Sequence, residues 1–125
     1  MKLYDWKGAP NPRRVLIFIK EKGIELPIVE VGADKKAVLK DDFLTNNSQR
    51  TVPVLELDDG TRIGEAMAIC RYLEPLYSEP PLMGTDLLEC TFVDMWERRA
   101  DMEGMQIRGR AESGIKRAAI EGMNI

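Results

Sequence analysis

Apolar residues in the first quarter of the chain follow first a strand pattern and then a helix pattern. A short apolar segment with strand propensity covers residues 3–6. A helix is predicted after a loop, with Asn11 as its N-cap and Pro12 at its first position. The apolar run 15–19 leaves this helix almost no polar side, which predicts that it is buried, and Gly23 is expected to end it.

The next segments extend this beginning into an α/β pattern. A second strand is predicted over residues 26–31, and a strand, helix and strand joined by short links form a unit with parallel strands. Residues 35–44 carry a weaker helical pattern, and the polar segment 46–50 is a loop.

Residues 51–64 predict a β-hairpin that the rest of the chain is built around. The turn Asp58-Asp59-Gly60 separates two apolar runs, and such a turn needs residues that tolerate positive φ. Pro53 lacks an amide donor and therefore suits only the start of the first strand. The Val52-Pro53 bond could be cis. In that case a ligand backbone could pair with Val52 as an added strand.

A third helix is predicted from Glu65, because apolar residues recur at helical spacing as far as Leu76. The link 79–84, with two prolines and a glycine, marks a boundary. Residues 1–78 therefore predict a β-α-β-α-β-β-α order in one α/β domain with a mixed sheet.

Beyond the link, residues 85–125 predict a partial helical domain. Thr85-Asp86 caps a helix that is expected to end near Met105, and a further short helix is predicted over 113–121. One long helix and a fragment cannot enclose a core, so they are expected to pack on other parts of the protein or on another chain.

Composition excludes several kinds of function. The chain of 125 residues has a net charge of −3, which argues against nucleic-acid or anionic-membrane binding. No apolar run approaches the ~20 residues of a membrane span, and the N-terminus lacks the apolar core of a signal peptide. Cys70 and Cys90 both lie in apolar helical patterns and are expected to be reduced core residues of a cytoplasmic protein. The absence of histidine excludes Ser-His-Asp and Cys-His catalysis and speaks against zinc.

Several short motifs, in this order and at these distances, resemble the cytosolic glutathione transferase family of bacterial type. They are Lys2-Leu3-Tyr4, Ala9 to Val15, Glu21-Lys22-Gly23-Ile24, Val52-Pro53-Val54-Leu55, Gly64-Glu65-Ala66, Ala68 to Glu74, Glu79 to Gly84 and Met95 to Arg99. The resemblance implies a thioredoxin-like glutathione-binding domain at 1–78, a linker at 79–84 and a partial all-helical C-terminal domain at 85–125. It also implies a cis bond before Pro53.

The chemistry of glutathione assigns roles to residues near the hairpin. The backbone of Val52, before Pro53, offers strand-like pairing to the middle residue of the tripeptide. The γ-glutamyl carboxylate can bind the backbone N–H groups where a helix opens at Glu65-Ala66, and the Glu65 carboxylate can meet the γ-glutamyl ammonium. Arg50 and Thr51, or Gln49 beside them, can meet the glycyl carboxylate.

The thiol is expected at the start of the first helix, where the helix dipole and free N–H groups favour a thiolate. The position that resembles the catalytic serine or cysteine is Ala9, which cannot donate to sulfur. Asn11 is therefore the predicted catalytic residue, with its role as a plain N-cap kept as the alternative. Tyr4 lies on the strand that carries the catalytic tyrosine in other classes of the family. It comes earlier in the chain than that tyrosine is expected, so it is not assigned a catalytic role. The family's usual serine is replaced by Ala66, which predicts weaker glutathione binding.

The resemblance implies a glutathione transferase that activates the glutathione thiol for attack on an electrophilic or disulfide substrate, typically in detoxification. Glutathione is the co-substrate, with a hydrophobic or disulfide second substrate, no metal, no nucleic acid and no membrane, in a cytoplasmic homodimer. Two alternatives stay open: a catalytically weak glutathione-binding module, and a dimerisation module of the same fold from a truncated chain.

Overall fold

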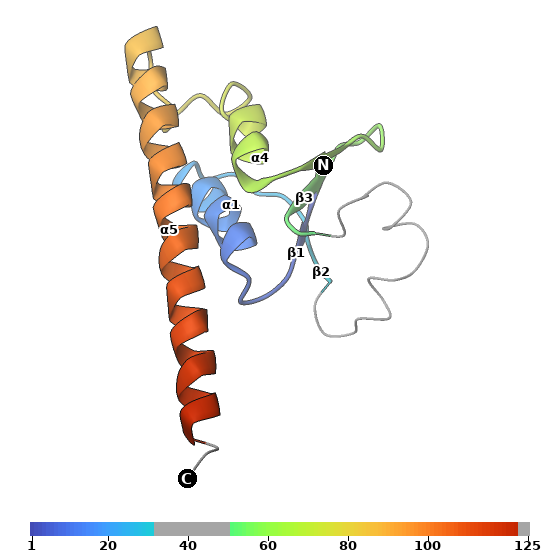
Figure 1. Cartoon of the computed structure of the whole chain (residues 1–125). Helices are drawn as coiled ribbons and strands as arrows, with labels where there is room; N and C mark the ends of the chain where they lie inside the picture. The colour runs from blue at the N-terminus through green and yellow to red at the C-terminus, as the bar shows by residue number, and fades with distance from the viewer. Residues whose placement is uncertain (32–50, 123–125) are drawn as a thin grey trace. The chain divides into compact units, whose positions relative to one another are not determined.

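The computed structural model describes residues 1–31 and 51–122 (Figure 1). The chain divides into two compact units, Met1–Leu82 and Met83–Ile125. The division falls inside the segment 79–84 that the sequence predicts as a linker. The weak helix expected over 35–44 lies outside the described residues.

A four-stranded mixed sheet forms the centre of the first unit. Its strands lie in the order β2-β1-β3-β4, and their bounds are β1 (Lys2–Asp5), β2 (Ile28–Glu30), β3 (Val54–Glu56) and β4 (Arg62–Gly64). Strand β1 is parallel to β2 and antiparallel to β3, which is antiparallel to β4. The mixed sheet is confirmed, although the second strand is shorter than the predicted 26–31.

The turn of the β3–β4 hairpin has the geometry that its residues predict. Gly60 adopts a φ of +86°, which a side chain would strain. The Thr61 N–H donates to Asp59 Oδ1 at 2.8 Å, and the Leu57 N–H donates to the Thr61 carbonyl at 2.8 Å. The predicted hairpin is therefore confirmed.

The first helix, α1 (Pro10–Glu21), begins earlier than the sequence predicts. Its N-cap is Ala9, which makes no side-chain cap, so the prediction of Asn11 as the N-cap is wrong. Pro10 takes the first helical position, where a missing N–H costs nothing, and Asn11 becomes the second helical residue. Gly23 follows the helix with a φ of +63°, as expected for its end.

The core lies between α1, α4 (Ala66–Leu73) and the sheet. Helices α1 and α4 are in contact. The buried apolar residues are Leu3, Val15, Phe18, Ile19, Ile24, Val54, Leu55, Ala66, Ile69, Cys70 and Leu73. Helix α1 buries only one face, because Ile17 is 53% exposed, so the expectation of burial on nearly every side is wrong.

The second unit is built on one continuous helix, α5 (Leu87–Gly122). Asp86 Oδ1 accepts from the Glu89 N–H at 2.9 Å, and Glu89 Oε2 accepts from Thr85 at 2.8 Å (N–H) and 2.6 Å (Oγ1). This cap confirms the predicted helix start. The predicted end near Met105 is wrong, since an internal glycine costs a helix only about 1 kcal/mol.

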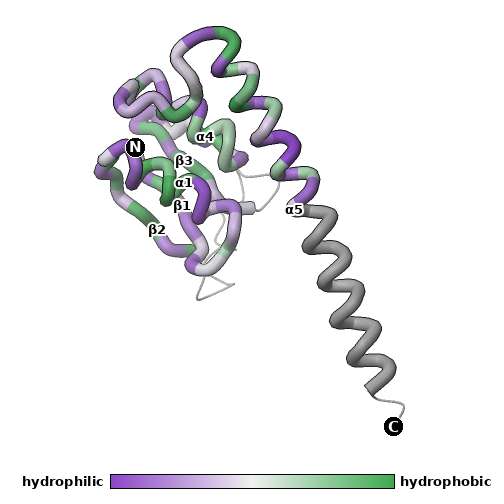
Figure 2. The backbone as a smooth tube through the Cα atoms, turned by 90° about the vertical axis from the view of Figure 1, so that its left-hand side faces the viewer, coloured by the Kyte–Doolittle hydropathy of each residue, from purple (hydrophilic) through white to green (hydrophobic). Residues whose placement is uncertain are grey.

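The first turns of α5 alternate between hydrophobic and hydrophilic residues (Figure 2). Cys90 is exposed there, whereas Cys70 is buried in the first unit. The expectation that both cysteines are core residues therefore holds for Cys70 alone. Leu87 and Leu88 beside Cys90 are also exposed, so helical spacing of apolar residues was no guide to burial here. Among the helices of the described ranges, none combines the length and hydropathy that a membrane span requires.

Candidate functional site

One end of the sheet gathers most of the predicted site residues. Val54 at the start of β3 pairs with Gly64 at the end of β4. Pro53 directly precedes Val54, and Glu65 directly follows Gly64, so both flank this pair at the same end of the ladder. Directly opposed residues of an antiparallel pair have Cα atoms about 4.5–5.5 Å apart. The segments 52–53 and 65–66 therefore lie next to each other.

The start of α1 belongs to the same end of the sheet. Tyr4 pairs with Val54, so the end of β1 at Asp5 lies beside the start of β3. Only residues 6–9 separate β1 from α1, and the Ala9 N–H closes this loop by donating to the Trp6 carbonyl at 2.9 Å. The topology therefore brings Ala9 and the start of α1 to the end of the sheet where β3 begins.

The segment before β3 has the backbone geometry that the resemblance implies. The Val52-Pro53 peptide bond is cis. Pro53 is buried, Val52 is half-buried and Thr51 is exposed. Arg50 and Gln49, proposed for the glycyl carboxylate, lie outside the described residues.

Glu65 has an unusual backbone conformation. Its φ is 64° and its ψ is 121°, and it is the sole non-glycine residue with positive φ in the described part of the chain. Such a conformation costs of order 1–3 kcal/mol in a non-glycine residue and concentrates at functional sites. The Glu65 side chain is exposed and does not cap α4. Its carboxylate is thus open to solvent at this end of the sheet.

The first turn of α4 supplies N–H groups that precede the intrahelical ladder. The ladder begins with the Ile69 N–H, which donates to the Glu65 carbonyl at 3.1 Å. The N–H groups of Ala66, Met67 and Ala68 come before it and carry the positive end of the helix dipole. Of these three residues only Ala66 is named in the sequence-based prediction, although a helix start at Glu65 implies such N–H groups at all three.

Helix α1 has few backbone donors in its first turn. Pro10 and Pro12 have no N–H, so Asn11 supplies the single backbone donor among the first three helical residues. Asn11 is exposed and adds a side-chain amide, which also donates. No acidic residue lies in this turn. An anion at the start of α1 would therefore depend on two donors of the same residue, the backbone N–H and the side-chain amide of Asn11.

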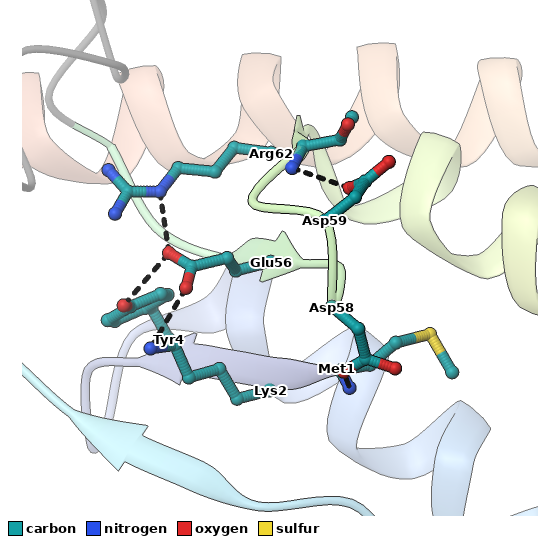
Figure 3. A network of polar contacts seen from close by, with 8 residues as sticks. Met1, Lys2, Tyr4, Glu56, Asp58, Asp59 and Arg62 are labelled. Carbon is teal, nitrogen blue, oxygen red and sulfur yellow. Dashed lines mark hydrogen bonds and ion pairs between the residues drawn. The ribbon is translucent and has the colours of Figure 1, made fainter.

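Tyr4 belongs to a polar network on the face of the sheet opposite Leu3 (Figure 3). Glu56 Oε2 accepts from the Tyr4 hydroxyl at 3.1 Å and from Arg62 Nε at 2.7 Å, and Glu56 Oε1 lies 2.9 Å from Lys2 Nζ. The bond from Lys2, helped by Arg62 and Tyr4, lowers the pKa of Glu56 to about 2. Tyr4 is therefore part of a network that joins three strands.

Metal chemistry has no candidate here, since the described residues hold no group of three or more histidine, cysteine, aspartate or glutamate side chains placed to bind an ion.

Known proteins of one family resemble this chain in sequence and in fold. The family model for the glutathione S-transferase N-terminal domain matches residues 3–81. Glutathione S-transferase 2 of Saccharomyces cerevisiae is 40% identical over 105 residues, which cover 82% of this chain and 45% of that protein.

Two crystal structures are similar in both sequence and fold. A glutathione S-transferase domain-containing protein of Marinobacter aquaeolei is 41% identical with a TM-score of 0.74, covering 81% of this chain and 50% of that one. Gtt2 of Saccharomyces cerevisiae is 40% identical with a TM-score of 0.73, covering 82% of this chain and 50% of that one.

The first unit is a thioredoxin-like domain, as its mixed sheet and these structures show. The chain belongs to the glutathione S-transferase family. It spans about half the length of the relatives that it matches.

Proposed function

We propose that this chain binds glutathione at the end of the sheet where β3 begins and activates its thiol for attack on an electrophilic or disulfide substrate. The observation that carries the proposal is the backbone of Glu65. A residue with a side chain is held at positive φ where α4 opens, directly after the Gly64 that pairs with Val54. Strain of this kind persists where a function requires the position of the residue.

The γ-glutamyl group is assigned to the opening of α4. The Glu65 carboxylate meets the γ-glutamyl ammonium, and the N–H groups of Ala66 and Met67 meet the γ-glutamyl carboxylate. Ala66 is buried and offers no hydroxyl, so the carboxylate depends on backbone donors.

The remaining two residues of the tripeptide are assigned to the segment before β3. Val52 pairs through its backbone with the cysteinyl residue, in the manner of an added strand. Thr51, with Arg50, meets the glycyl carboxylate.

The thiol is assigned to the start of α1. Asn11 donates from its backbone N–H and its side-chain amide to the sulfur, which lowers the thiol pKa and releases the proton to solvent. The thiolate then attacks an electrophilic carbon to form a thioether, or a disulfide sulfur to form a mixed disulfide and release the other thiol.

Thermal unfolding with reduced glutathione tests binding. A ligand that binds the folded state raises the melting temperature as its concentration exceeds the dissociation constant. We expect a rise with glutathione and a much smaller one with cysteinylglycine, which lacks the γ-glutamyl group. No shift at millimolar glutathione would sink the proposal.

A second candidate function is glutathione binding without useful turnover. Ala9 and Ala66 favour it, because neither position offers the hydroxyl or thiol that the family places there. Turnover of a generic electrophile and of a mixed disulfide separates the two candidates. If glutathione raises the melting temperature and neither substrate reacts, the second candidate function, binding without turnover, is correct.

The proposal extends to a cytoplasmic homodimer that acts in detoxification. The family resemblance supports all three parts of this proposal, and the two free cysteines, Cys70 and Cys90, suit a reducing compartment. Sedimentation at micromolar concentration tests the oligomeric state.

A further inference from the structure

Lys22 stands out among the lysines because its ammonium group is buried. The residue is 8% exposed and its side chain is inaccessible to solvent. Lys22 is the C-cap residue of α1, where a solvated lysine would be expected. Nζ also lies 5.3 Å from the centre of the Phe18 ring, so the charge is surrounded by protein.

Three acceptors from a single segment surround this ammonium group. Lys22 Nζ donates to the Tyr77 carbonyl at 2.7 Å and to the Pro80 carbonyl at 2.7 Å. It also lies 2.8 Å from Glu74 Oε2. An ammonium group has three protons, and these three acceptors match that number. The acceptors are 55, 58 and 52 residues away along the chain.

Glu74 extends the contact to the end of the first unit. Its second carboxylate oxygen, Oε1, accepts from the Leu82 N–H at 2.9 Å. The Tyr77 N–H adds a bond to the Leu73 carbonyl at 3.0 Å, directly after α4. Lys22 and Glu74 together therefore hold both ends of the irregular segment 74–82.

This segment is held at its start by backbone bonds to α4, since the Glu74 N–H donates to the Cys70 carbonyl at 2.9 Å and the Leu76 N–H to the Leu73 carbonyl at 3.1 Å. It contains no helix or strand, and it includes three prolines, which have no N–H to donate. Leu76 is 53% exposed and Leu82 is 37% exposed, so apolar burial contributes little. A buried ammonium group that satisfies carbonyls of such a segment determines its path more than packing does.

We propose that Lys22 and Glu74 form a clamp, meaning the ammonium–carboxylate pair with its bonds to Tyr77, Pro80 and Leu82. The clamp fixes the segment from which the chain leaves the first unit. We expect the sheet and the apolar contact between α1 and α4 to form without it, because they rest on buried apolar residues such as Val15 and Ile69. Lys22 is about 16 Å from Asn11 along α1, at the opposite end of that helix from the proposed glutathione site.

Amide hydrogen exchange of the 125-residue chain tests the clamp. In Lys22→Met, which keeps the apolar stem, the Tyr77 and Leu82 amides should exchange roughly tenfold faster or more, the size of one lost charge-assisted bond. The amides of Leu55 in β3 and Cys70 in α4 should keep their rates. Lys20→Met, an exposed lysine in the last turn of α1, is the matched control and should change none of them.

A second variant keeps the test decisive if Lys22→Met fails to fold. Glu74→Gln removes the charge but keeps an oxygen for the Leu82 N–H, so exchange should rise at Tyr77 more than at Leu82. Unchanged exchange at Tyr77 in this variant overturns the clamp. Equal acceleration at Tyr77 and Leu55 also overturns it, because Lys22 would then support the whole unit.

Discussion

Asn11 illustrates how a single residue can carry two different interpretations. As an N-cap it would bond to its own helix, but the N-cap is Ala9 and the helix starts at Pro10, so the Asn11 amide is not needed there. Because the prolines on both sides of Asn11 have no N–H, Asn11 supplies the donors that the start of α1 offers to an anion. The correction to the cap therefore strengthens the proposed role at the thiolate.

Replacing Asn11 should affect turnover more than binding. In Asn11→Ala the thiolate loses one donor, so we expect kcat to fall roughly tenfold or more, the size of one hydrogen bond to a charged group. Asn11→Asp should be worse, since a carboxylate raises the pKa of the bound thiol. Steady-state kinetics and the glutathione-induced melting shift measure the two effects. An equal loss of kcat and of the melting shift would contradict the role.

Glu65 is tested by pairing a variant with a ligand analogue. Glu65→Gln should weaken glutathione binding roughly tenfold, because the ammonium of the ligand loses its counter-charge. Glutathione without its amino group should bind weakly to the unchanged protein. Titration calorimetry of the unchanged protein and of Glu65→Gln, each with glutathione and with the analogue, measures this cycle. If Glu65→Gln weakens the analogue as much as glutathione itself, Glu65 does not contact the ammonium.

Ala66 allows a gain-of-function test. Ala66→Ser restores the hydroxyl at the opening of α4, and we expect about 1 kcal/mol tighter glutathione binding from the added hydrogen bond. Ala68→Ser, an exposed position in the same turn, is the control for a general effect of serine. Binding that is unchanged in Ala66→Ser, or improved equally in both variants, would argue against a carboxylate at this position.

At the scale of elements, the Glu56 network joins β1, β3 and β4. Its folded pKa of about 2 lies below the ordinary 4.5, so its stabilisation is present above pH 4.5 and is lost as the pH falls through 2. Because the network is partly open to solvent, we expect Glu56→Gln to cost roughly 1–2 kcal/mol at pH 7.

Urea unfolding of this variant and the unchanged protein between pH 7 and pH 2 measures the effect. The difference in unfolding free energy should shrink below pH 4.5. A difference that is constant over this range would show that the Glu56 charge contributes nothing. In the variant one carboxylate oxygen becomes an NH2 group, which cannot accept a hydrogen bond, so Lys2 and Arg62 no longer have an acceptor oxygen each.

The elements predicted correctly are those with local signals. The turn at Asp59-Gly60, the end of α1 at Gly23 and the cap at Asp86 each depend on neighbouring residues. The burial of Lys22 could not be predicted, because its acceptors are more than 50 residues away. The continuity of α5 past Gly104 was also missed, since an internal glycine weakens a helix without ending it.

The same distinction applies to the candidate site. Val52 and Pro53 directly precede the β3–β4 hairpin, and Glu65 and Ala66 directly follow it, so their proximity follows from the turn and the register. The strained backbone of Glu65 had no local signal, because acidic residues are ordinary at helix starts. It is a property of the folded hairpin.

At the scale of the whole molecule, the first unit carries the candidate site, and the second unit is a capped helix. The chain belongs to the glutathione S-transferase family and spans about half the length of its matched relatives. Every group proposed to contact glutathione lies in the first unit. Binding should therefore depend on the first unit alone, whereas turnover of the second substrate is a separate question.

An NMR titration of the full chain with reduced glutathione tests the central claim most directly. We predict saturable shifts of the backbone amides of Asn11, Val52, Ala66 and Met67, which surround the proposed tripeptide. The amides of Lys22 and of Leu88 in α5 should stay unchanged. Saturable shifts confined to other residues, or no shifts at millimolar glutathione, would contradict the account.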